Sequence, residues 1–233
     1  PAVDSAGNVY APGITEYSYW GASFDDSNII KVFAPKWPIE YTGFLAKYDG
    51  DGDAQWAIAT PNGFQVGLSC IPVGCSGNAW HNEAGGGSLA VDDDGMILLV
   101  APVPSYDYYF GGFHLSGPQF PHYEFFASQI SPEGEVMWVS PIEAGHSQSE
   151  RPTMRFNDIS FTDDGDAVIV GTSICDSDPS PQDSDPSPEE MIVVFGDFEV
   201  ICYYTDGMVP GYSVFIVTID QQGNWGHGIS TAS

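Results

Sequence analysis

Acidic residues at regular spacing are the first candidates for chemistry in this sequence. The segment 49–53 reads Asp-Gly-Asp-Gly-Asp, and carboxylate oxygens are the ligands that Ca²⁺ prefers in proteins. The candidate Ca²⁺ ligands are therefore Asp49, Asp51 and Asp53. An EF-hand loop would also need Gly and Glu at the positions of Ala54 and Thr60. A tight turn without a metal explains the same residues, so both interpretations stay open.

Catalysis needs groups in a defined constellation, and the sequence presents none. His146 lies beside Ser147, but the segment 145–149 lacks the final Gly of a nucleophile elbow. Gly85–Gly87 precede a β-rich run without a Lys, unlike a phosphate-binding loop. We assign no catalytic residue and expect a non-enzyme with no cofactor apart from Ca²⁺. A polysaccharide hydrolase or lyase is an alternative, although so many carboxylates would place a pair at glycosidase distance by chance.

Aromatic side chains gather in three loop-like stretches. A Tyr or Trp ring has a flat apolar face and a polar edge, which suits stacking on a sugar or anchoring a protein partner. The candidate ligand-binding residues are Tyr17, Tyr19, Trp20, Tyr106, Tyr108, Tyr109, Phe110, Tyr203 and Tyr204. The alternative is that these rings form small cores that keep long loops folded.

The charge of the chain excludes several classes of partner. Its 233 residues include 32 Asp and Glu but only 5 Lys and Arg, which gives a formal net charge of -27. Proteins bind nucleic-acid backbones and anionic membrane surfaces through clusters of Lys and Arg, so we expect neither as a partner. The longest apolar stretches, 96–103 and 191–195, are too short for a helix that spans a membrane.

The cysteines and the first residue bear on the compartment. Four cysteines without Cys-x-x-Cys spacing allow three pairings, and the shortest contours favour Cys70–Cys75 and Cys175–Cys202. Disulfides predict an extracellular or cell-surface location, with the periplasm as a variant. The sequence begins at Pro1 without an initiator Met, which suggests a removed signal peptide or a longer parent chain. Four free thiols in a cytosolic protein are the alternative.

A repeated turn motif predicts the β-hairpins that hold the candidate residues in place. The pattern Asp/Ser/Thr-x-x-Gly lies between β-rich runs six times, with turn glycines Gly7, Gly52, Gly95, Gly134, Gly165 and Gly223. The first polar residue caps the backbone, and Gly adopts the positive φ that a tight hairpin needs. Two hairpin types alternate, the first over 2–13, 89–100 and 159–171, the second over 44–56, 126–138 and 215–225.

Two hairpins make one four-stranded antiparallel sheet, so the repeat predicts an all-β protein. Three such sheets in series are typical of β-propeller blades, here with long insertions. We expect blade 1 in 1–60, a loop and blade 2 in 61–142, and blade 3 in 143–233. The third contains an acidic insertion over 174–190 and an extra hairpin over 191–204.

Three blades do not close a ring of about 4–8, so the propeller would be part of a larger or oligomer-completed molecule. Alternating strand directions place the six tight turns at one end and the long connections at the other. A β-sandwich is the alternative, but it does not explain the alternating repeat.

Two of these motifs resemble a known family. Residues 44–56 read Phe-x-Ala-Lys-Tyr-Asp-x-Asp-Gly-x-x-x-Trp, and residues 2–13 read Ala-Val-Asp-x-x-Gly-x-Val-x-x-x-Gly. They resemble the seven-bladed β-propeller-type (SBBP) repeats of bacterial secreted and surface proteins, and more distantly pyrroloquinoline-quinone-type propeller repeats. The resemblance implies a propeller outside the cytoplasm. Trp225 departs from it, two residues after its turn glycine instead of four, which leaves the register of the last strand open.

These patterns predict an extracytoplasmic, non-catalytic binding or scaffold module that presents aromatic loops to a glycan or protein partner at the cell surface. A second reading is a structural subunit that self-associates as a homo-oligomer into a surface layer or filament.

Overall fold

The computed structural model describes residues 1–16, 41–60, 88–102, 108–115, 125–145, 152–175, 190–203 and 211–232. The regular elements in these ranges are β-strands, which confirms the all-β class. No helix in the described part of the chain has the length and apolarity to cross a membrane.

The first and third sheets are four-stranded antiparallel meanders, as predicted. The first sheet consists of β1 (Ala2–Val3), β2 (Val9–Glu16), β3 (Tyr41–Tyr48) and β4 (Ala54–Thr60). The third consists of β11 (Pro152–Phe161), β12 (Ala167–Cys175), β15 (Gly211–Ile219) and β16 (Trp225–Ala232). Neighbours in each sheet are hydrogen-bonded in sequence order.

The second sheet has six strands, so the expectation of four is wrong. It contains β5 (Ser88–Val91), β6 (Ile97–Pro102), β9 (Phe125–Ile130), β10 (Val136–Gly145), β13 (Glu190–Phe195) and β14 (Phe198–Tyr203). The extra hairpin β13–β14 was expected, but it joins the second sheet and not the third. Strand β10 extends to Gly145, and β13 pairs with its last three residues. The hairpin thereby covers an edge that would otherwise be unpaired.

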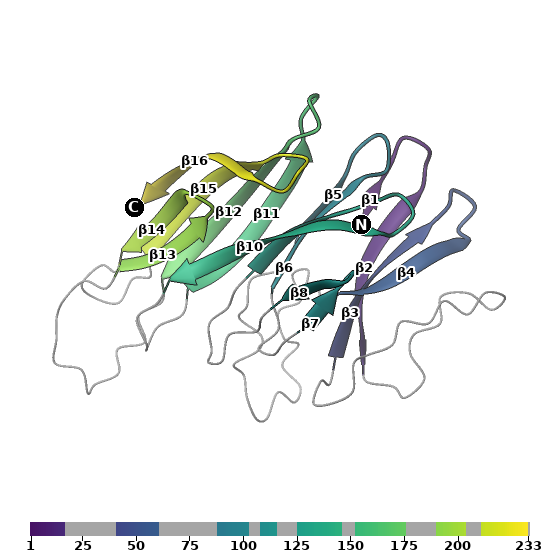
Figure 1. Ribbon diagram of the computed structural model, residues 1–233, viewed down its shortest axis with the longest axis horizontal. Helices are drawn as coiled ribbons and strands as arrows, with labels where there is room; N and C mark the ends of the chain where they lie inside the picture. Colours follow the sequence, from purple (N-terminus) through teal and green to yellow (C-terminus); the bar gives the residue numbers. More distant parts are fainter. Residues whose placement is uncertain are drawn as a thin grey trace.

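The three sheets stack in a row, with one apolar core in each interval (Figure 1). Tyr10 and Leu45 of the first sheet pack with Ile97, Leu99 and Phe126 of the second. The opposite face of the second sheet, to which its strands β13 and β14 contribute, packs against the third sheet. The first strands of the sheets also adjoin, since β1 contacts β5 and β5 contacts β11.

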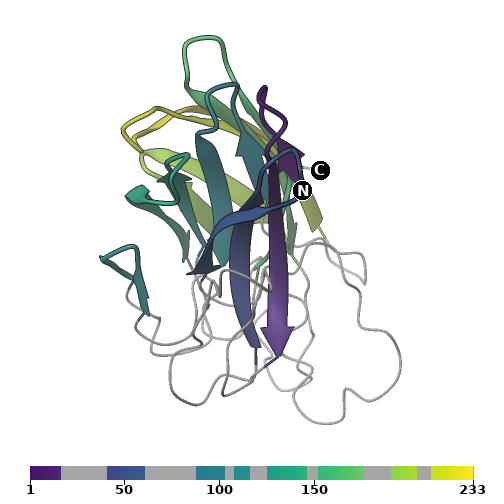
Figure 2. The same ribbon diagram turned by 90° about the vertical axis from the view of Figure 1, so that its right-hand side faces the viewer.

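The tight turns lie at one end of the molecule, as strand alternation predicts (Figures 1 and 2). Hydrogen bonds join turns of different sheets: the Ser5 hydroxyl donates to the Asp93 carbonyl over 2.6 Å. Strand ends that lead into the long connections lie at the opposite end, where Glu16 pairs with Tyr41 and Cys175 with Gly211.

Candidate functional site

The six predicted turns share one geometry. In the turn 49–52, the Gly52 amide donates to the Asp49 carbonyl at 3.0 Å, and the Asp49 amide donates to the Asp53 carbonyl at 3.0 Å. The other five repeat this backbone pattern. The six turn glycines have φ between 83° and 90°. This is a type I turn that ends in a bulge, where a Cβ would be strained.

The candidate Ca²⁺ ligand Asp49 acts as a backbone cap in this turn. Its Oδ1 accepts the amides of Asp51 and Asp53 at 3.0 and 2.9 Å, and its Oδ2 accepts Gln55 Nε2 at 2.7 Å. Both oxygens therefore have partners without a metal. Asp51 and Asp53 are exposed on the turn. No group of three or more His, Cys, Asp or Glu in the described ranges is arranged to hold a metal ion.

Hydrogen bonding also perturbs titration at the first turn. Asp4 Oδ1 accepts the amides of Ala6 and Asn8, and Oδ2 accepts Asn8 Nδ2 and the Tyr10 hydroxyl. Burial alone would raise the pKa of Asp4, but the hydrogen bonds outweigh it, so the pKa lies below its ordinary value. Burial raises the pKa of Tyr10 well above its ordinary value, and the bond to Asp4 adds to this effect.

Two tryptophans link consecutive sheets in the same way. Trp56 Nε1 donates to the Pro132 carbonyl at 2.9 Å, and Trp138 Nε1 donates to the Gln221 carbonyl at 2.9 Å. Each acceptor is the second residue of the β9–β10 or β15–β16 turn in the next sheet. Each indole also lies on the glycine of that turn, since a Cβ on Gly134 or Gly223 would lie 2.9 or 2.8 Å from the ring. We call this arrangement the tryptophan clasp.

The structure resolves the register of the last strand. Ile219 pairs with Trp225 as Ile130 pairs with Val136, so the third sheet keeps the register of the second. Trp225 therefore occupies an inward position, where its Nε1 donates to the Pro141 carbonyl at 3.2 Å. The clasp position, four residues after the turn glycine, belongs to the exposed His227.

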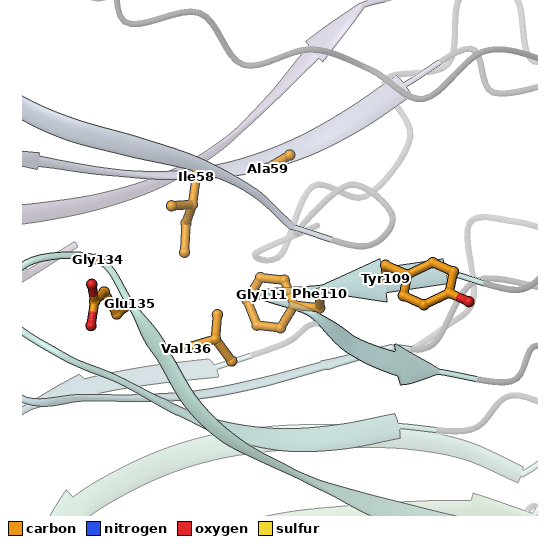
Figure 3. A pocket seen from close by; sticks show the side chains of 8 residues that line it. All are labelled: Ile58, Ala59, Tyr109, Phe110, Gly111, Gly134, Glu135 and Val136. Atoms are coloured by element: carbon orange, nitrogen blue, oxygen red, sulfur yellow. The ribbon is translucent and has the colours of Figure 1, made fainter.

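An open cleft of about 590 Å³ lies on the flank of the molecule, between the first and second sheets. Three elements line it: β4, the turn side of β10, and the hairpin formed by β7 (Tyr108–Phe110) and β8 (Phe113–Leu115). The lining residues are Ile58, Ala59, Tyr109, Phe110, Gly111, Gly134, Glu135 and Val136. Ile58, Phe110 and Val136 converge on its floor, with Glu135 at one end and Tyr109 at the other (Figure 3).

The β7–β8 hairpin separates the predicted aromatic residues into two roles. Phe110 is 2% exposed and packs on Phe126, with ring centroids 5.5 Å apart, so it anchors the hairpin in the core. Tyr109 is 68% exposed and stacks on His114, with ring centroids 4.9 Å apart. Its ring therefore lies at the outer end of the cleft and points away from Ile58 and Val136 (Figure 3).

This placement differs from the expectation that the aromatic residues lie at the long-connection end. A Cβ on Gly111 would lie 2.2 Å from the Cβ of Val136, so the hairpin tip sits directly on β10 beside its turn. The two-stranded hairpin carries Tyr109 and Phe110 back along the flank.

The remaining aromatic candidates divide between two described strands and stretches that the structure does not describe. Tyr108 and Tyr203 lie in β7 and β14. Tyr17, Tyr19, Trp20, Tyr106 and Tyr204 lie outside the described residues. Their ligand-binding role stays a prediction.

The disulfide pairings stay predictions as well. Cys175 ends β12, and Cys202 lies in β14, which contacts β12. Cys70 and Cys75 lie outside the described residues.

The chain also contains a second repeated motif, which the turn pattern did not predict. Phe-Gly-Gly-Phe at 110–113 and Phe-Gly-Asp-Phe at 195–198 form the turns of β7–β8 and β13–β14. Gly111 meets Val136 and Gly196 meets Trp225, and both partners lie two residues after a turn glycine. Each hairpin is thus inserted between two sheets at an equivalent place. Phe-Gly-x-Phe is therefore the sequence signal for a hairpin inserted between two sheets, and its first copy lines the cleft.

No known protein-family model and no curated protein sequence matches the chain.

Proposed function

We propose that the chain is an extracytoplasmic, non-catalytic segment of a β-propeller that binds a neutral glycan in the flank cleft. The repeated sheets, their common turn end and the adjoining first strands support consecutive blades around an axis. The resemblance to secreted SBBP repeats and the four cysteines support a location outside the cytoplasm.

The observation that carries the binding proposal is the exposed Tyr109 ring at one end of an open cleft. A pyranose ring offers an apolar face of C–H groups that stacks on a tyrosine ring. At the other end, the exposed Glu135 carboxylate accepts hydrogen bonds from sugar hydroxyls. Ile58 and Val136, which are partly buried, supply apolar surface between these groups. The cleft thus combines an apolar wall with few polar groups, as binding sites for small ligands do.

Charge restricts the class of glycan. A chain with a formal net charge of -27 repels polyanions, and the described residues that line the cleft include no cation. Uronic-acid and sulfated polysaccharides are therefore disfavoured. Among the lining residues that the structure describes, Glu135 is the one carboxylate, whereas glycosidases use two. This supports binding without hydrolysis.

A glycan array with isothermal titration of the best neutral oligosaccharide tests the proposal. Tyr109→Ala should weaken binding about 30-fold, the effect of losing an aromatic anchor worth about 2 kcal/mol. The matched control is Met137→Ala, which removes an exposed apolar side chain outside the cleft lining and should leave Kd unchanged. Equal Kd values for Tyr109→Ala and the unmodified chain would refute the site, and measurable glycan turnover would refute the non-catalytic role.

A further inference from the structure

The interface between consecutive sheets is built twice from the same positions. Counted from the turn glycines, Ile97 and Leu99 of the second sheet correspond to Ala167 and Ile169 of the third. The first two pack in the core against the first sheet, and the others pack in the core against the second. Phe126 and Phe215, eight residues before their turn glycines, belong to the same two faces. Each sheet therefore uses a fixed face to pack on the sheet before it.

The first sheet has this same face, although no sheet of the described chain precedes it. Tyr10 points into the core toward the second sheet, so its neighbours Val9 and Ala11 point the opposite way. They hold the positions of Ile97 and Leu99. The Phe44 ring lies on Gly13, as the Phe215 ring lies on Gly171. These half-buried residues repeat the positions that pack on a preceding sheet elsewhere in the chain, and the first sheet lies at one end of the row in Figure 1.

The third sheet presents the complementary face at the other end of the row. In the first two sheets, Tyr10 and Leu98 lie three residues after a turn glycine and pack toward the next sheet. Val168 holds that position in the third sheet. Its face also carries Val170, Val214, Ile216 and Ile229, which the strand register places side by side. Val214 is 48% exposed and Ile229 is 66% exposed.

The tryptophan clasp gives a second, independent observation: its acceptor half in the first sheet and its donor half in the third have no clasp partner in the described residues. In the first sheet, Gly50 holds the acceptor position of Pro132 and Gln221, and no atom of the described residues lies within 4 Å of a Cβ placed on Gly52. The third sheet has His227 at the donor position of Trp56 and Trp138. An imidazole N–H donates a hydrogen bond as an indole N–H does. The chain thus carries both halves of one more clasp, at opposite ends.

We propose that the third sheet of one copy packs on the first sheet of a second copy, in the arrangement that already joins the sheets within the chain. His227 then donates to the Gly50 carbonyl of the second copy. The occupant is a second copy of this chain, whose third sheet repeats the position through which Tyr10 and Leu98 pack toward the next sheet. Two copies joined head to tail bring six sheets, which falls within the roughly 4–8 blades of closed propellers. The inference rests on the proposed blade arrangement and not on glycan binding.

Sedimentation of the 233-residue chain at low and at about 1 M salt tests the assembly. We expect twice the chain mass, favoured by salt because screening reduces repulsion between two acidic copies. Ile229→Glu on the third sheet and Ala11→Glu on the first should each abolish the dimer while circular dichroism stays unchanged. Met137→Glu, on neither face, should keep it.

Mixing the two face variants distinguishes head-to-tail packing from any symmetric interface. One intact first-sheet face and one intact third-sheet face remain in the mixture, so a heterodimer should form. A monomer under all conditions, association that survives both substitutions, or no rescue on mixing would overturn the proposal. Tyr109→Ala should leave the mass unchanged, so failure of glycan binding and failure of assembly are separate results.

Discussion

Turn glycines at equivalent positions of the repeat have different surroundings in the fold. Gly52 and Gly134 both have a positive φ, but only Gly134 lies beneath an indole, that of Trp56. Gly52→Ala should lower the free energy of unfolding by about 1–2 kcal/mol through backbone strain alone. Gly134→Ala should cost clearly more, because its Cβ would lie 2.9 Å from Trp56. Urea unfolding of both variants measures this, and equal losses would mean that the clasp contributes nothing.

The carboxylate cap of the last turn predicts a pH dependence. Asp220 Oδ1 accepts the amides of Gln222 and Asn224, at 2.9 and 2.8 Å. Burial opposes its ionisation, but the hydrogen bonds outweigh burial and lower its pKa below the ordinary 3.8. A lowered folded-state pKa stabilises the fold above pH 3.8, and this contribution is lost as the pH falls through the folded-state value.

Asp220→Asn should therefore flatten the loss of stability between about pH 5 and 2, measured by urea midpoints. Ser131→Ala is the control, because it removes an equivalent cap that does not titrate. It should cost about 1 kcal/mol at every pH. An unchanged acid slope in Asp220→Asn would contradict the role of the carboxylate.

At the scale of elements, the clasps predict a graded response. Trp138→Phe keeps a ring but removes the donor to the Gln221 carbonyl, and should cost about 1 kcal/mol or more. Trp56→Phe should cost less, because Lys47 Nζ still donates to the Pro132 carbonyl at 3.0 Å. Thermal unfolding of the two variants ranks them. The reverse order would show that the indole N–H bonds are not what joins the sheets.

The sequence predicted the hairpins whose turns depend on neighbouring residues. It did not predict features that depend on contacts between distant strands. Capping residues and glycines such as Asp49 and Gly52 define a turn by themselves, so the hairpins could be placed. The hairpin at 191–204 was also visible, but its sheet depends on the free edge of β10 at Glu143–Gly145, which no local pattern shows. The early Trp225 left the strand register open, because spacing alone cannot distinguish a shifted strand from an unshifted strand that carries Trp at a different position.

The candidate site was predictable only in part, for the same reason. Aromatic residues in a loop-like stretch indicated Tyr109 as a candidate ligand-binding residue, and this role stays a prediction. Sequence could not separate it from the buried Phe110, because which of two neighbours enters the core depends on how the hairpin docks. The cleft also needs Ile58 and Glu135, which come from two other strands.

For the molecule as a whole, charge is the dominant long-range term. Like charges destabilise a compact chain with a net charge of -27, and salt screens this repulsion. The urea midpoint should therefore rise as NaCl increases from about 0.01 to 1 M. A midpoint that falls with salt would mean that specific ion pairs outweigh the general repulsion.

The central claim is that the flank cleft between the first two sheets is the recognition surface. Amide chemical-shift mapping of the isotope-labelled chain, titrated with the best neutral oligosaccharide, locates binding directly. The account predicts shifts at Tyr109, Gly111 and Glu135, with the distant turn at Gly165 unchanged. Shifts confined to the other end of the molecule, with Tyr109 unaffected, would contradict it.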